Sequence, residues 1–146
     1  MAIQGFGAAN PNDIRIFEAH NGIYLPNDYV KFLLTYNGGV VKPTDENSIY
    51  IEDLNATVNV DVFFGVKTKD PELDVQLWLN DYKSDMPQGT IIVGDSHQHG
   101  FIVLLCTGEE TGVYYWDHAY EFPNSNDESN TYYIADTFTE VVKNLL

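Results

Sequence analysis

The sequence predicts an α+β fold in which helices flank a mainly antiparallel sheet. Two helical patterns occupy the first 40 residues, β-rich runs separated by turn-forming clusters fill the middle, and a helical pattern closes the chain. The chain has 146 residues, of which 44% are hydrophobic, so it is long enough to bury one real core. We therefore expect a single domain over residues 1–146, with two N-terminal helices and one C-terminal helix.

The two N-terminal helices have different signals. Ile14 and Phe17 predict a short amphipathic helix that begins near Asn12. The second helix begins at Pro26, because the first helical position tolerates a missing N–H, and it stops at 37–39, an Asn-Gly-Gly sequence. Its apolar residues recur at helical spacing: Leu25, Tyr29, Phe32, Leu33 and Tyr36.

Strands and a further helix follow a polar stretch at 43–47. Residues 49–51 and 58–66 are rich in β-branched and aromatic residues, which predicts strands. In the second run, apolar residues alternate with polar ones: Val58, Val60, Val62 and Phe64. Asp70-Pro71-Glu72 predicts a helix start, and the helix ends before residue 87. One face of this helix is apolar: Val75, Trp78, Leu79 and Tyr82.

Three apolar runs then predict an antiparallel meander. They cover 90–93, 100–106 and 112–116, with turn-forming clusters between them. After a polar loop at 123–130, residues 132–135 lead into the last helix, which Thr137 and Glu140 begin at capping-box spacing. Its apolar stripe consists of Phe138, Val141, Val142 and Leu145.

The charge of the chain restricts its partners. Twenty-two acidic residues against seven basic ones give a net charge of −15. From Asp70 to the end, 14 acidic residues face only Lys83 and Lys143, a local balance of −12. Such a surface repels nucleic acid and anionic lipid and speeds encounters with basic partners, although acidity also serves solubility. We expect no nucleic-acid or membrane partner.

Cysteine usage and hydropathy indicate a cytoplasmic protein. Cys106 has no second cysteine to pair with, and it lies in the apolar run 101–106, where we expect a buried thiol that behaves as a small hydrophobe. No basic N-terminal segment precedes an apolar stretch, and no apolar run approaches the roughly 20 residues that span a bilayer. The sequence carries no signal for a particular oligomeric state.

Several segments, in this order and spacing, resemble the SUKH superfamily, which includes yeast regulators of cell-wall synthesis and many bacterial immunity proteins. The resemblance covers almost the whole chain. It depends on Ile16-Phe-Glu18 leading to Leu25-Pro-Asn-Asp-Tyr29, on Phe32-Leu-Leu-Thr-Tyr-Asn-Gly-Gly39, on Ile91-Ile-Val-Gly-Asp95, on Gly112-Val-Tyr-Tyr-Trp-Asp-His118 and on Ile134-Ala-Asp-Thr-Phe138. The segment 95–100 departs from the family, because members more often carry Gly, Asp and Asn where this chain has His97 and His99.

The resemblance implies a sheet flanked by helices and no catalytic activity or cofactor. Bacterial members look like antidotes to polymorphic or contact-delivered toxins, many of them nucleases with basic clefts, so an acidic inhibitor could dock by charge. We therefore predict an immunity protein that neutralises a cognate, basic, nuclease-type toxin; the alternative is a non-enzymatic regulatory or scaffold adaptor for host proteins. Candidate contact residues, chosen by charge and loop position, are Asp95, His97, His99, Glu109, Glu110, Asp117, Asp127 and Glu128.

The sequence also raises an enzymatic alternative. In an extended segment Asp95, His97 and His99 would face one side and could share a metal ion, yet a polar hairpin loop gives the same pattern without an ion. Cys106 is flanked by apolar residues, Ser96 lacks a Gly-x-Ser-x-Gly context, and no phosphate-binding glycine loop is present. We predict no catalytic residue, metal or cofactor, and a small metal-dependent enzyme remains the third hypothesis.

Large aromatic residues could serve the core or a partner. Trp78 and Trp116 are large enough to anchor a partner, but the periodicity around each predicts a place in the core. Tyr114 and Tyr115 alternate on a predicted strand, so one faces the core and the other faces solvent or a partner.

Overall fold

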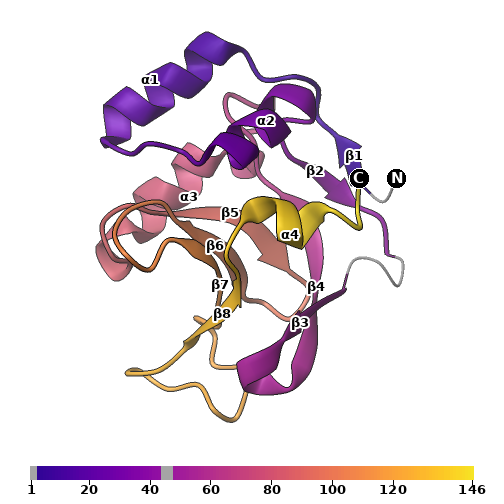
Figure 1. The fold of residues 1–146 in the computed structure, drawn as a ribbon, viewed down its shortest axis with the longest axis vertical. Helices are drawn as coiled ribbons and strands as arrows, with labels where there is room; N and C mark the ends of the chain where they lie inside the picture. The colour runs from indigo at the N-terminus through magenta and orange to yellow at the C-terminus, as the bar shows by residue number, and fades with distance from the viewer. Residues whose placement is uncertain (1–2, 44–47) are drawn as a thin grey trace.

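A computed structural model describes residues 3–43 and 48–146; most of the predicted polar stretch at 43–47 lies outside these ranges. The predicted α+β class is confirmed: helices flank an antiparallel sheet (Figure 1). The strands are β1 (Ile3–Gly5), β2 (Gly39–Val41), β3 (Ser48–Ile51), β4 (Ala56–Phe63), β5 (Thr90–Ser96), β6 (Phe101–Leu105), β7 (Gly112–Trp116) and β8 (Thr131–Ala135). The helices are α1 (Pro11–Asn21), α2 (Asn27–Thr35), α3 (Val75–Tyr82) and α4 (Phe138–Val142), with 3₁₀ turns η2 (Glu52–Leu54), η3 (Pro71–Leu73) and η4 (Lys83–Asp85).

The strands follow the order β1-β2-β4-β5-β6-β7-β8, and β3 pairs with β4 outside this path. Every pairing between these strands is antiparallel, so the predicted meander of β5, β6 and β7 is confirmed. The alternation predicted for β4 holds at Val58 and Val60, which are fully buried, and breaks at Val62, where the register shifts. A bulge of this kind adds a residue to one strand and reverses the faces that follow.

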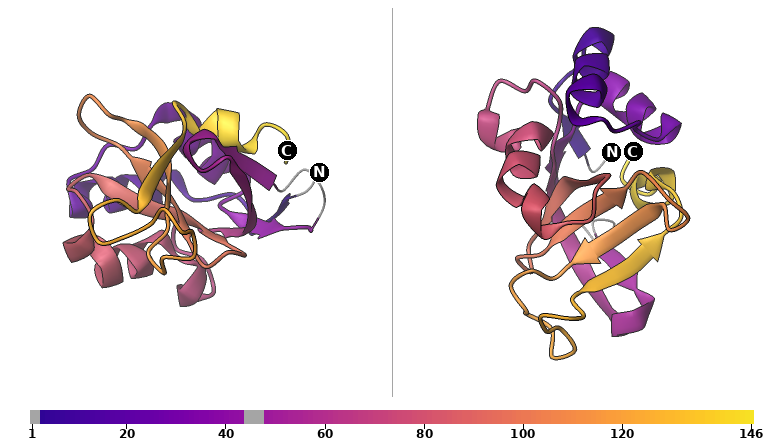
Figure 2. Two further views of the ribbon diagram at one scale, coloured as in Figure 1. Left: turned by 90° about the horizontal axis from the view of Figure 1, so that it is seen from below. Right: turned by 90° about the vertical axis from the view of Figure 1, so that its left-hand side faces the viewer.

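The sheet is covered on both faces, as two consecutive residues demonstrate. Phe63 packs edge-on against Phe32 of α2 and Phe138 of α4, at centroid distances of 5.8 and 5.7 Å. Phe64 instead stacks on Trp78 of α3, at 5.1 Å and 16°. Accordingly, α2 and α4 cover one face and α3 covers the other (Figure 2). We call these the α2/α4 face and the α3 face.

Local signals set the ends of the first two helices. The side chain of Asn10 accepts a hydrogen bond from the amide of Asn12, so α1 begins at residue 11, slightly before the predicted start. Asn37 and Gly38 have φ values of 51° and 83°, which end α2 as predicted. A Cβ at Gly38 would lie 2.5 Å from the carbonyl oxygen of Phe63, so glycine is required for space as well as conformation.

The start predicted for the middle helix at 70–72 is wrong. Asp70 caps only η3, and the side chain of Asp74 accepts a hydrogen bond from the amide of Gln76 to begin α3 at residue 75. The turn η3 and the helix α3 are separate because the backbone of Gly65 forms hydrogen bonds with the residues at their junction. The Gly65 amide donates to the Leu73 carbonyl, and the Gly65 carbonyl accepts from the Val75 amide, both at 2.9 Å.

The last helix begins as predicted, because the hydroxyl of Thr137 accepts a hydrogen bond from the amide of Glu140. A carboxylate oxygen of Asp28 in α2 accepts hydrogen bonds from the amide and hydroxyl of Thr139, at 2.9 and 3.0 Å, and so ties α4 to α2. In the part of the chain that the structure describes, no helix has the length and apolar character needed to cross a membrane.

Candidate functional site

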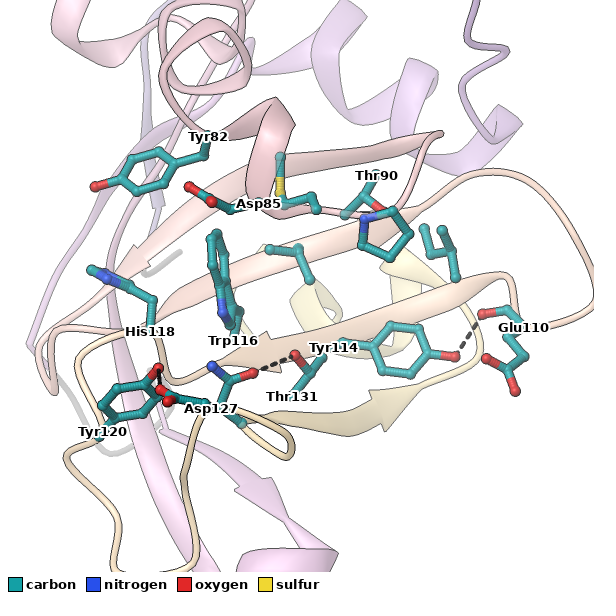
Figure 3. A pocket seen from close by; sticks show the side chains of 15 residues that line it. Tyr82, Asp85, Thr90, Glu110, Tyr114, Trp116, His118, Tyr120, Asp127 and Thr131 are labelled. Carbon is teal, nitrogen blue, oxygen red and sulfur yellow. Dashed lines mark hydrogen bonds between the residues drawn. The ribbon is translucent and has the colours of Figure 1, made fainter.

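A groove of about 570 Å³ opens on the α3 face, beside the end of α3 (Figure 3). Side chains of β6 and β7 form its floor: Val103, Leu105, Tyr114 and Trp116. One wall comes from the end of α3, η4 and the chain that leads into β5: Tyr82, Asp85, Met86, Pro87 and Thr90. Glu110 and the segment 118–131 provide the rest of the lining: His118, Tyr120, Asp127, Asn130 and Thr131. We call it the α3-face groove.

Strand alternation selects which residues of β7 reach the groove. Val113 and Tyr115 are fully buried on the opposite face, whereas Tyr114 and Trp116 line the groove and are only partly buried. Tyr115 is therefore the core tyrosine, and Tyr114 is the one available to a ligand. The Tyr114 hydroxyl donates a hydrogen bond to the backbone carbonyl of Glu110, which orients the ring.

An aromatic cluster forms one end of the groove. The His118 ring stacks on Phe101 at 4.4 Å and 11°, and Tyr82 meets Trp116 edge-on at 5.7 Å and 88°. Trp116 also lies against His118, with ring centroids 5.5 Å apart. Trp78 and Trp116 both pack against the hydrophobic core, as predicted, but Trp116 has a second role because its ring also lines the groove.

The groove has a negative rim and no fixed positive charge. Three acidic residues line it, Asp85, Glu110 and Asp127, and none of the 15 lining residues is lysine or arginine. Burial lowers the pKa of His118, and this effect outweighs the negative charges of Asp117 and Asp95, which act to raise it. The imidazole is thus neutral at pH 7 and adds no positive charge.

Asp117 holds the loop that carries Tyr120 and Asp127. It is fully buried, and its carboxylate accepts hydrogen bonds from the amides of Glu121 and Phe122 and the hydroxyl of Ser125, at 3.0, 2.9 and 2.6 Å. Asp117 was predicted to contact a partner, but its side chain is buried and its oxygens accept hydrogen bonds inside the protein. A buried carboxylate needs such donors to offset its desolvation.

Two further polar groups of the groove differ in their partners. The Tyr120 hydroxyl donates a 2.6 Å hydrogen bond to the Asp127 carboxylate, which joins the two residues on one wall. Thr90 is only 6% exposed, and its hydroxyl oxygen has no hydrogen-bond partner in the described chain. A buried hydroxyl without a partner is costly, so this position favours a ligand that supplies one.

Two of the remaining predicted contact residues line the groove, and the other five do not. Glu110 and Asp127 line it, while Glu109 and Glu128 are exposed on the same two loops. Asp95, His97 and His99 belong to β5 and the β5–β6 turn, and they are not among its lining residues. Burial raises the pKa of Asp95.

The extended arrangement considered for a metal site is wrong. Residues 97–99 form a turn, and His99 has a φ of 66°. The exposed His97 side chain points to Asp61, with its Nδ1 atom 3.7 Å from a carboxylate oxygen. In residues 3–43 and 48–146, no three His, Cys, Asp or Glu side chains are grouped to hold a metal ion.

Cys106 is partly buried, close to the predicted environment, and its thiol contacts the carbonyl oxygen of Leu104 at 3.8 Å. Burial raises its pKa to about 12, so the thiol stays protonated at neutral pH. A protonated thiol is a poor nucleophile.

Sequence reasoning missed Tyr82, Asp85, Thr90 and Tyr120 as groove residues. Tyr82 was assigned to the core by its helical spacing, and it does pack there as well. The pattern Tyr114-x-Trp116 was the available signal, because two aromatic residues on one strand face next to a buried Tyr115 indicate an open aromatic surface.

Comparison with known proteins identifies the family of the chain. No curated protein matches it. The model of the SMI1 / KNR4 family (SUKH-1) matches residues 8–144, which include every residue of the groove. The chain therefore belongs to the SMI1 / KNR4 family (SUKH-1), as its sequence segments indicated.

Proposed function

We propose that this protein is an immunity protein that binds and neutralises a cognate basic toxin through the α3-face groove and its rim, without catalysis of its own. Its family is commonly associated with immunity proteins. The observation that carries the proposal is the groove lining, which combines four large aromatic side chains with acidic residues as its only charged groups at pH 7: Tyr82, Tyr114, Trp116, Tyr120, Asp85, Glu110 and Asp127.

The charges support binding of a basic partner. In the described parts of the chain, no lysine or arginine nitrogen lies within 4.0 Å of a carboxylate oxygen; the one such contact is made by a histidine, His97, with its Nδ1 atom 3.7 Å from Asp61. The acidic side chains of residues 3–43 and 48–146 therefore form no direct ion pair with a lysine or arginine of these ranges. A net charge of −15 steers a basic protein toward the surface and orients it before contact.

The aromatic floor supports a protein partner in particular. Tyrosine and tryptophan dominate the energetic centres of protein interfaces, because they bury a large area with few rotatable bonds. Trp116 and Tyr114 present rings on a rigid strand, so little order is lost when a partner packs on them.

Affinity capture tests the proposal. The tagged protein is incubated with lysate of its own organism and with the product of the neighbouring gene upstream, then washed at low and at high salt. We expect a basic toxin to be retained at low salt and weakened at high salt, and co-expression to suppress its toxicity. Recovery of host proteins alone would contradict the immunity function and indicate a regulatory adaptor.

A further inference from the structure

We infer that the Trp116 end of the α3-face groove is a subsite for one arginine side chain of the partner. The inference rests on the proposed function and specifies which chemical group of the toxin is recognised. The guanidinium would stack on the Trp116 ring and pair with the carboxylates of Asp85 and Asp127.

The positions of the acids fit a group that can pair in two directions. Asp85 comes from η4 on one wall and Asp127 from the loop on the other, and Figure 3 shows Trp116 between them. A guanidinium has five donors in a plane, so it can donate toward both walls while its face lies on an aromatic ring. Asp127 keeps the hydrogen bond from Tyr120 and still has free acceptor positions.

The aromatic groups around this point favour a cation. Tyr82 and Trp116 are partly buried and Tyr120 is 47% exposed, so ring surface is available at the groove. The negative face of an aromatic ring attracts a cation, and arginine sheds water more readily than lysine when it stacks. His118 beside Trp116 is neutral at pH 7, because burial lowers its pKa, and does not oppose the charge.

No group of the described chain fills the subsite. Lys83, the basic residue nearest to Asp85 in the sequence, lines a neighbouring cavity and not this one. The buried Thr90 hydroxyl without a partner lies on the same groove wall as Asp85. It provides independent support for a ligand, because a polar atom of a segment lying along the groove would complete its hydrogen bonding.

A peptide titration tests the subsite without the toxin. The full chain is titrated at low salt with acetyl-Gly-Arg-Gly-amide, and the indole N–H signals of both tryptophans are followed by NMR. Lysine and citrulline versions are the matched controls, since citrulline keeps the planar shape without the charge. We expect the arginine peptide to shift Trp116 but not Trp78, whose indole donates to the Glu72 carbonyl, and to bind roughly ten-fold more tightly than citrulline.

Substitutions locate the effect. Asp85→Asn and Asp127→Asn should each weaken the arginine peptide several-fold while Asp53→Asn, on an exposed residue outside the groove, leaves it unchanged. Asparagine at 127 can still accept the Tyr120 hydrogen bond, so the loop is preserved. Equal binding of arginine and citrulline peptides, or equal shifts from a neutral oligosaccharide, would overturn the subsite.

The subsite and the proposed function fail separately. A toxin that binds in a salt-dependent way while the arginine peptide leaves Trp116 unshifted would refute the subsite and leave the immunity function standing. If the arginine peptide binds at Trp116 but the protein neutralises no toxin, the subsite stands and the immunity function is refuted.

Discussion

The two faces of the sheet use aromatic residues in different ways. On the α2/α4 face, Tyr29, Phe32, Phe63 and Phe138 are at most 5% exposed and pack edge-on or stacked with one another. On the α3 face, Trp78, Tyr82, Tyr114 and Trp116 are only partly buried. The aromatic cluster of the α2/α4 face is thus fully buried, whereas on the α3 face Phe64 and Phe101 are buried and four larger side chains remain partly accessible.

The difference has a geometric cause. Helix α3 has 8 residues, so it is about 12 Å long and covers only a few strands spaced about 4.8 Å apart. Its aromatic residues reach Phe101 and Trp116, and beyond them the floor of β6 and β7 is open. The short helix therefore leaves the groove uncovered, and the loop held by Asp117 becomes its far wall.

The largest expected effect is on stability and comes from the closed face. Phe138→Ala removes a ring, 1% exposed, that contacts Tyr29, Phe32 and Phe63, and we expect a loss of about 3–5 kcal/mol in the free energy of unfolding. Urea denaturation measures it. A loss below about 1 kcal/mol would contradict the description of this face as tightly packed.

Asp117→Ala should cost about 2–4 kcal/mol, because it leaves three donors without their acceptor. We expect faster hydrogen exchange at the amides of Glu121 and Phe122, and weaker toxin binding, since the loop carries Tyr120 and Asp127. Asp117→Asn is the control, because its amide oxygen keeps part of the network. Unchanged exchange in the alanine variant would show that the carboxylate does not hold the loop.

Trp116→Ala should reduce toxin affinity more than Phe138→Ala does, and folding stability less. Its ring is partly buried, so we expect a loss of stability of about 1–3 kcal/mol, smaller than that for Phe138, measured in the same denaturation series. Toxin affinity should fall by about 2 kcal/mol or more, as for a central aromatic contact. If the variant loses stability as much as Phe138→Ala and binds the toxin normally, the two faces do not differ in function.

The smallest effect concerns pH. The pKa of His118 is lowered by burial, so the folded protein binds its proton less tightly than the unfolded chain, whose histidine pKa is about 6.5. The stability from the neutral ring is present above pH 6.5 and is lost as pH falls through the lower folded pKa. His118→Gln should flatten the dependence of unfolding free energy on pH below about 6.5. Asp95, with a pKa raised by burial, gives the opposite slope nearer its own range.

Sequence reasoning succeeded where the signal is local. The Asn-Gly-Gly stop of α2 and the Thr137 cap of α4 depend on neighbouring residues, and both were predicted. It failed where a distant segment decides. The start of α3 depends on Gly65, whose backbone pairs with residues 73 and 75. Asp117 comes directly after a predicted strand, where an acidic residue is usually exposed. It is buried instead, and its carboxylate accepts hydrogen bonds from groups four to eight residues later in the chain.

The groove was the least predictable part for the same reason. Its lining comes from segments near residues 85, 90, 104, 115 and 127, and only the pairing of β5 to β8 with the placement of α3 brings them together. Glu110 and Asp127 were chosen for charge and loop position, and both line the groove. Trp116 was assigned to the core because alternation along a strand does not reveal how far a helix covers that face.

A comparison of two charge reversals tests the central claim most directly. Asp85→Lys and Asp53→Lys change the net charge equally, and both residues are exposed, but only Asp85 lines the groove. For the captured toxin, we predict that Asp85→Lys raises Kd roughly ten-fold or more at low salt, with a smaller change at high salt, while Asp53→Lys raises it less than about three-fold. Equal losses in both variants would mean that only net charge matters, and would contradict recognition through the α3-face groove.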